Sequence, residues 1–286
     1  MSCAEALLER PPVRQPGAFG RLYRSEVQLV LRRRRNLALL VVLGLVPMII
    51  GVAVKVSTPT AGDGPQFLGQ VTGNGLFLVF TALTVCLPFF LPLVVGVVAG
   101  DSIAGEASTG TLRYLLTVPV TRGRLLASKT LGVLTFTALA VLTVAGVGLL
   151  TGAVLFGLGD VTLLSGDVVP LADGLLRALG VAAYVVVALF GLAAGGVFVS
   201  TLTENAIGAM ATTIALAVFS ALLDAVPQLK AIHPYLLTHN WLGFGELLRG
   251  HIDTGSLLRW SALHLAYAAV FLSLAWSRLR TKDVTS

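Results

Sequence analysis

The chain is poor in charge and in cysteine. Only 12% of its 286 residues are charged and 56% are hydrophobic, and its mean hydropathy is +0.88. Because a soluble domain carries about 25% charged residues, this composition argues against a soluble protein and favours one built for a lipid bilayer. The two cysteines, Cys3 and Cys86, fall in a polar N-terminal tail and in an apolar stretch. No disulfide framework is therefore expected.

Motifs of common enzyme classes are also missing from the sequence. It contains no G-x-x-x-x-G-K-[ST] loop to cradle phosphates, no H-E-x-x-H zinc motif and no G-x-S-x-G nucleophile turn. We therefore predict a non-catalytic chain with no cofactor and no metal of its own. The polar first 36 residues are too long for the n-region of a cleavable signal peptide.

What the chain does have is a series of long apolar stretches. About 20 residues at 1.5 Å rise cross the hydrocarbon core of a bilayer as a helix. Three stretches contain no Asp, Glu, Lys, Arg or His at all. We predict an all-α membrane protein with six transmembrane helices, at about 37–54, 76–99, 131–158, 178–203, 205–226 and 260–277.

The basic residues predict how the chain is oriented. Eight lie before residue 37, four in 100–130 and three after residue 277, whereas the opposite side holds the other five of the 20. Lys and Arg collect on the cytoplasmic side of short loops, so both termini are expected in the cytoplasm and the chain in the cell (inner or plasma) membrane. The net charge of +6 is then an orientation signal. A nucleic-acid partner is not expected, since these residues lack interleaved aromatics.

The N-terminal region divides into two parts. Residues 1–16 are expected to form a flexible cytoplasmic tail. In 17–36, apolar residues recur near helical spacing and arginines occupy much of the rest, which is typical of a helix lying in the membrane interface. A simple cluster of stop-transfer charges is the alternative. Residues 37–286 form the six-span domain.

Pro88 and Pro92 lie four residues apart in the second span. Proline removes a backbone donor and kinks a helix, so this span is predicted to bend in mid-membrane. A bent helix could line a translocation path, and a packing kink without such a role explains the pattern equally well.

Two pairs of glycines are also spaced by four: Gly148 with Gly152, and Gly191 with Gly195. This spacing lets two helices approach closely. We predict that these faces pack helices together.

The four histidines are a second set of candidates. His264 is the one ionisable residue within the last span, and we favour a neutral imidazole bonded to a neighbouring helix over a functional role. His233, His239 and His251 are spaced by 6 and 12, which does not place them on one helix face. A metal cluster among them is weakly supported, and Asp224 is expected to face the interface.

Residues 228–258 are too broken by polar residues to span a membrane but rich in Leu and aromatic residues. We predict short helices at the outer interface, with Tyr235 and Trp241 at the lipid headgroups. The join at Thr201–Asn205 is short, so spans four and five form a tight hairpin.

The loop between spans two and three reads GEASTGTLRYLLTVPVTRGRLLASK, from Gly105 to Lys129. Leu112, Leu115 and Leu116 fall on one face of a short helix that Pro119 would end. Such a helix, tethered to two spans, could insert into a groove on a soluble partner. A basic helix resting on anionic lipid is the alternative.

This loop resembles the cytoplasmic loop of ABC-2 type permeases, the membrane subunits of many ATP-driven exporters. The matching residues are Gly105, Glu106, Gly110, Thr111, Leu112, Leu115, Leu116, Pro119, Val120, Arg122, Leu125, Leu126 and Lys129. The resemblance implies two permease subunits, as a homodimer or heterodimer, bound to separate ATPase subunits that carry the ATP and Mg. It also implies that 104–118 is a coupling helix and that the substrate path follows the dimer interface, with spans two and five prominent.

Two sets of site candidates follow. Those for contact with the ATPase are Glu106, Thr111, Leu112, Arg113, Leu115, Leu116 and Arg122. Those for the translocation path are Pro88, Pro92, Asn205 and His264. Two rival hypotheses are a membrane scaffold or signalling subunit that binds an ATPase without transport, and a membrane enzyme that uses His239, His251 or His264.

Overall fold

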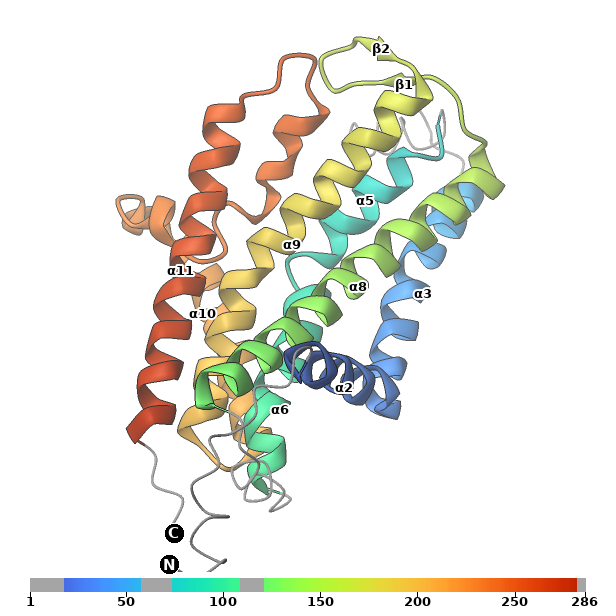
Figure 1. Ribbon diagram of the computed structural model, residues 1–286. Helices are drawn as coiled ribbons and strands as arrows, with labels where there is room; N and C mark the ends of the chain where they lie inside the picture. The colour runs from blue at the N-terminus through green and yellow to red at the C-terminus, as the bar shows by residue number, and fades with distance from the viewer. Residues whose placement is uncertain (1–17, 58–73, 109–120, 282–286) are drawn as a thin grey trace, which may run out of the picture.

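The computed structural model describes residues 18–57, 74–108 and 121–281. Within these residues the chain is a bundle of helices, and six of them are long and apolar enough to cross a membrane (Figure 1). The predicted all-α membrane fold with six spans is therefore confirmed. The six helices are α3 (Arg34–Val56), α6 (Phe90–Ser108), α8 (Arg122–Phe156), α9 (Leu171–Leu202), α10 (Ala206–Asp224) and α11 (Thr254–Thr281).

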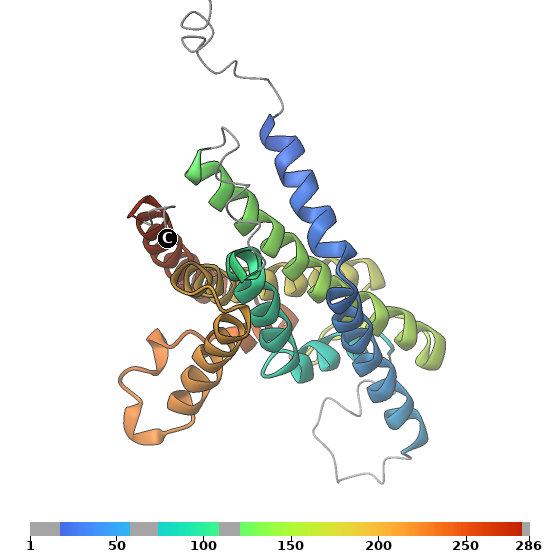
Figure 2. The ribbon, with the colours of Figure 1, turned by 90° about the horizontal axis from the view of Figure 1, so that it is seen from below.

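A helix before the first span, α2 (Ala18–Arg32), lies across one end of the bundle (Figures 1 and 2). Only Arg33 separates it from α3. α2 rests on α8, where the Tyr23 hydroxyl bonds the Thr135 hydroxyl at 2.7 Å. The end of α6, the start of α8 and the end of α11 lie at this same end, which we call the basal end (Figure 1). That α2 lies in the membrane interface, and that the basal end is cytoplasmic, stay predictions.

The second predicted span consists of two helices. α5 (Phe77–Cys86) is a shorter apolar helix, and α6 begins at Phe90 after a turn that contains Pro88. The break lies where a proline cannot donate to the helical ladder, so the predicted bend is confirmed. Pro92 falls in the first turn of α6, where no backbone donor is lost to the helix.

Four of the helices, α3, α8, α9 and α11, are longer than the uncharged stretches from which they were predicted. α8 has 35 residues and α9 has 32, and at 1.5 Å per residue such helices exceed a hydrocarbon core of about 30 Å. α8 begins at Arg122, not near 131, and α6 continues to Ser108. The predicted spans stopped at the first charged residue. The helices continue past these residues because other side chains pair with their charges.

α9 lies at the centre of the described bundle and is buried along much of its length. It contacts α6, α8, α10 and α11. A Cβ built on Gly191 would lie 3.3 Å from the His264 carbonyl oxygen, and one on Gly195 would lie 3.3 Å from Phe271. The predicted small-residue face of span four is thus the surface on which α11 packs.

A hairpin joins α8 to α9 at the opposite end of the bundle. Its strands are β1 (Val161–Thr162) and β2 (Val168–Val169), paired antiparallel with Val161 opposite Val169. The turn contains Gly166, whose φ of +90° favours glycine. The apolar pattern of the sequence did not predict this hairpin.

The segment after α10 forms short helices, as predicted, and all three are 3-10 helices: η1 (Pro227–Leu229), η2 (His233–Tyr235) and η3 (Trp241–Leu248). That they lie at the outer interface stays a prediction. Tyr235 is 67% exposed, as a headgroup position requires, but Trp241 is only 4% exposed. The prediction for Trp241 was wrong because this residue is buried where η3 packs against α9.

Capping side chains fix the first turns of α10 and α11. Asn205 begins α10 by accepting the backbone N–H of Gly208 at 3.1 Å, which confirms the tight hairpin between α9 and α10. Asp253 precedes α11 and accepts the backbone N–H of Ser256 at 3.1 Å and its hydroxyl at 2.6 Å. These bonds from Ser256 hold the pKa of the exposed Asp253 carboxyl below its ordinary value.

Candidate functional site

Six charged side chains meet at the basal end, on the helices that flank residues 109–120. We call them the basal ion-pair network: Glu26, Arg33, Arg35, Asp101, Glu106 and Lys129. Three are basic and three are acidic, so the network is formally neutral. It joins α2, the α2–α3 junction, α6 and α8.

The centre of the network is Lys129 on α8. Its Nζ lies 2.9 Å from Glu26 Oε2 on α2 and also pairs with Glu106 Oε1 on α6. The lysine side chain is 3% exposed and each carboxylate 8%. A buried ammonium group between two carboxylates from different helices fixes three elements at one point.

Asp101 on α6 holds the second half of the network. Arg35 Nη2 lies 2.7 Å from Asp101 Oδ2, and Arg33 pairs with the same oxygen. The carboxylate is buried while both arginines are partly exposed. The bend between α2 and α3 is thereby tied to the lower part of α6.

α9 is attached to α6 at the same level by one hydroxyl. Ser200 Oγ donates to the Gly100 carbonyl at 2.7 Å and accepts the N–H groups of Ile103 and Ala104 at 3.0 and 2.8 Å. The two helices that flank residues 109–120, α6 and α8, are therefore both bonded to neighbouring helices.

The predicted ATPase contacts fall in two groups. Five of them lie outside the described residues, so the predictions for them stand as predictions: Thr111, Leu112, Arg113, Leu115 and Leu116.

The other two predicted contacts, Glu106 and Arg122, are described. Glu106 is buried in the network, 6% exposed. Arg122 opens α8, and its Nη1 donates to the carbonyl oxygens of Leu279 and Arg280 at 2.6 and 2.9 Å. Arg122 thus ties the start of α8 to the end of α11.

The structure does not gather the translocation-path candidates in one place. Pro88 and Pro92 lie at the break between α5 and α6, while Asn205 caps α10 at the turn that follows α9. His264 is fully buried on α11. Neither of its ring nitrogens has a hydrogen-bond partner among the described residues, so the expected bond to a neighbouring helix is not found there.

Sequence reasoning missed most of the network. It treated the arginines as an orientation signal and did not single out Glu26. One signal was available: acidic Asp101 and Glu106 follow one apolar stretch, and basic Lys129 precedes the next. Opposite charges at adjoining ends of two spans indicate an ion pair between them.

Comparison with known proteins gives two findings. A family model described as "Protein of unknown function (DUF2705)" matches residues 46–285. The chain is also 40% identical over 76 residues to the "Probable ABC transporter permease protein NosY" of Pseudomonas aeruginosa. That likeness covers 27% of this chain and 28% of the relative, so the chain matches little more than a quarter of the relative's length.

Proposed function

The chain belongs to the DUF2705 family of proteins of unknown function, and since that membership assigns no activity, we propose from its site that it is the membrane-spanning permease subunit of an ATP-driven (ABC) transporter. The partial likeness to a probable ABC transporter permease supports this class. The resemblance of the 105–129 loop favours the ABC-2 type and export.

The observation that carries the proposal is the basal ion-pair network. A subunit driven by a separate ATPase needs a docking segment whose movement reaches the spans without being lost in local flexing. Residues 109–120 connect α6 to α8, and Glu106 and Lys129 join these two helices on either side of that segment. The chain has no phosphate-binding loop, so in this proposal ATP and Mg are bound by the partner. Residues 104–118 of this chain are the coupling helix that contacts that partner.

The rival scaffold and enzyme functions receive less support. A membrane enzyme using His264 would need a hydrogen-bonded partner for the imidazole, and its ring nitrogens have none within the described part of the chain. A scaffold would bind the same ATPase but would not need the helices that flank the docking segment to be bonded to their neighbours. Transport that vanadate inhibits in proteoliposomes separates the permease from the scaffold.

Substituting Leu112→Asp together with Leu116→Asp tests the coupling helix. Both leucines form its predicted apolar face, and two carboxylates there would place charge in a hydrophobic groove. We expect copurification of the ATP-hydrolysing partner to fall at least about tenfold, since a loss of about 1.4 kcal/mol in binding is tenfold in affinity. The measurement is the ATPase activity retained per mole of purified chain.

The matched control is Leu164→Asp with Val168→Asp. These two exposed residues lie in the hairpin at the opposite end of the bundle, outside every span. The control should retain the partner in full. If the loop variant retained it too, or if the unaltered chain brought down no ATPase, the permease proposal would fail.

A dimer through α10 is a further part of the proposal. Its exposed face carries large apolar side chains, including Phe219 at 62% and Leu222 at 61% exposure, and the ABC-2 resemblance places span five at the dimer interface. In a Cys3→Ser, Cys86→Ser background, Phe219→Cys should give a cross-linked permease pair in native membranes.

Val154→Cys on α8, 84% exposed, is the control for this experiment and should not cross-link. Mass spectrometry of the cross-linked product distinguishes a homodimer of this chain from a heterodimer with a different permease. Cross-linking through Val154 and none through Phe219 would place the interface on another face.

A further inference from the structure

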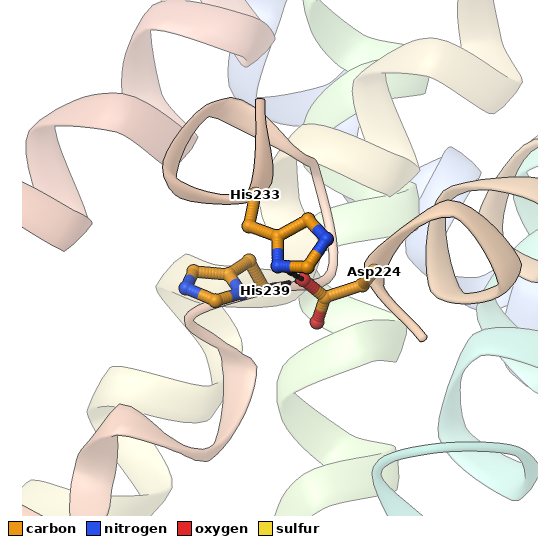
Figure 3. Close-up of side chains that lie close together, drawn as sticks. All are labelled: Asp224, His233 and His239. Carbon is orange, nitrogen blue, oxygen red and sulfur yellow. Dashed lines mark hydrogen bonds and ion pairs between the residues drawn. The ribbon is translucent and has the colours of Figure 1, made fainter. Parts of the chain in front are cut away.

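Three polar side chains outside the network converge beside the end of α10 (Figure 3). His239 Nδ1 lies 2.6 Å from Asp224 Oδ1, and His233 Nδ1 lies 3.7 Å from the same oxygen. The three atoms all lie within 4.8 Å of one another. The side chains are between 15% and 34% exposed, so a hydrated ion can reach them.

A hydrogen bond of His233 fixes which atom of its ring faces the cluster. His233 Nε2 lies 3.1 Å from the Val226 carbonyl oxygen, and a carbonyl only accepts, so Nε2 carries the proton. Nδ1, the other ring nitrogen of His233, faces the carboxylate of Asp224. A ring N–H held by a backbone carbonyl is also the usual support of a metal-binding histidine.

The segment that carries the histidines is fixed on both sides of His239. Thr238 is bonded to Ser220 on α10 through its backbone N–H at 3.2 Å and through its hydroxyl at 3.0 Å. The Asn240 carbonyl accepts the Tyr184 hydroxyl of α9 at 2.5 Å. The imidazole is therefore held near Asp224 by bonds that do not involve the cluster.

We propose that Asp224, His233 and His239 form a binding site for a divalent transition metal ion of the zinc class. Imidazole nitrogen with carboxylate oxygen suits Zn²⁺, whereas Mg²⁺ and Ca²⁺ take oxygen ligands. Ligand atoms at about 2.0 Å from a tetrahedral ion lie about 3.3 Å apart, and the observed 2.6 and 3.7 Å fall on either side of this separation. Three protein ligands leave a fourth position for water or another ligand.

The position of Asp224 favours a cation in a second way. It is the last residue of α10, where the helix dipole places partial negative charge. An ion bound there would fasten the end of α10 to the 226–240 segment, which lies beside the bundle well below the start of α11 (Figure 1). The site rests on these residues alone and does not depend on the permease function.

Zinc binding to the purified full-length chain tests the site. The chain should be prepared in detergent with an affinity tag that lacks histidine, and titrated with Zn²⁺ against a chromogenic chelator. We expect one ion per chain, unaffected by excess Mg²⁺. His239→Ala and Asp224→Asn should each weaken binding more than about tenfold, since even a residue that only supports a ligand is worth about 10- to 100-fold in metal affinity.

Two further variants keep the test decisive. His251→Ala removes an exposed histidine that is not in the cluster and should bind zinc as the unaltered chain does. His239→Cys supplies another zinc ligand and should recover binding that His239→Ala loses, which a folding defect would not allow. No zinc binding by the unaltered chain, or equal binding by His239→Ala and Asp224→Asn, would show that the cluster is only an ion pair.

Discussion

Replacing Lys129 with methionine is expected to lower the free energy of unfolding by about 3–5 kcal/mol, the usual cost of removing one partner from a buried ion pair. Lys129 is 3% exposed and pairs with both Glu26 and Glu106. Methionine fills similar space but leaves two buried carboxylates without a cation. The loss should appear as a lower melting temperature in detergent and as weaker ATPase stimulation, because α2, α6 and α8 are no longer held together.

Two comparisons separate this effect from a general loss of charge. Arg249→Met breaks an exposed pair with Glu246, 3.4 Å long, and such pairs contribute about 1 kcal/mol or less. Adding Glu26→Gln and Glu106→Gln to Lys129→Met removes the uncompensated charges, so the triple variant should regain much of the lost stability. If Lys129→Met were as stable as Arg249→Met, the network would not hold the basal end together.

Most of the fold follows from the apolar stretches of the sequence. Backbone groups in lipid must be satisfied internally, so each long stretch can only be a helix, and Pro88 with Pro92 predicted the bend in the second one. The ends of the helices did not follow in the same way. In the sequence, the charge of Lys129 indicates the end of a span. In the structure Glu26, more than a hundred residues earlier in the chain, neutralises that charge.

The candidate sites were harder to predict for the same reason. His233 and His239 were judged by α-helical spacing, but they lie in a 3-10 helix and in the turn that follows it, where that spacing does not apply. Asp224 joins them because α10 ends at that residue and the chain turns back beside it. Trp241 shows the same limit, since aromatic content suggests the interface while the packing of η3 on α9 buries it.

Glycine packing could be predicted from spacing, and it leads to the second large effect. A Cβ built on Gly152 of α8 would collide with the carbonyl of Gly75 and lie 3.0 Å from its Cα. The obstacle is backbone, fixed by the bond from the Gly75 N–H to the Gly157 carbonyl at 3.0 Å, so it cannot rotate away. Gly152→Ala should therefore destabilise the protein by about 1–3 kcal/mol or more, the cost of overpacking.

Gly146→Ala on the same helix is the matched control, because a Cβ there meets nothing within 4 Å. Alanine at an open helical position should stabilise by about 0.5–1 kcal/mol. The two substitutions add the same methyl group to the same helix, so their opposite effects on the melting temperature isolate the contact with Gly75. Equal shifts in both variants would mean that Gly75, just before α5, does not approach α8 at Gly152.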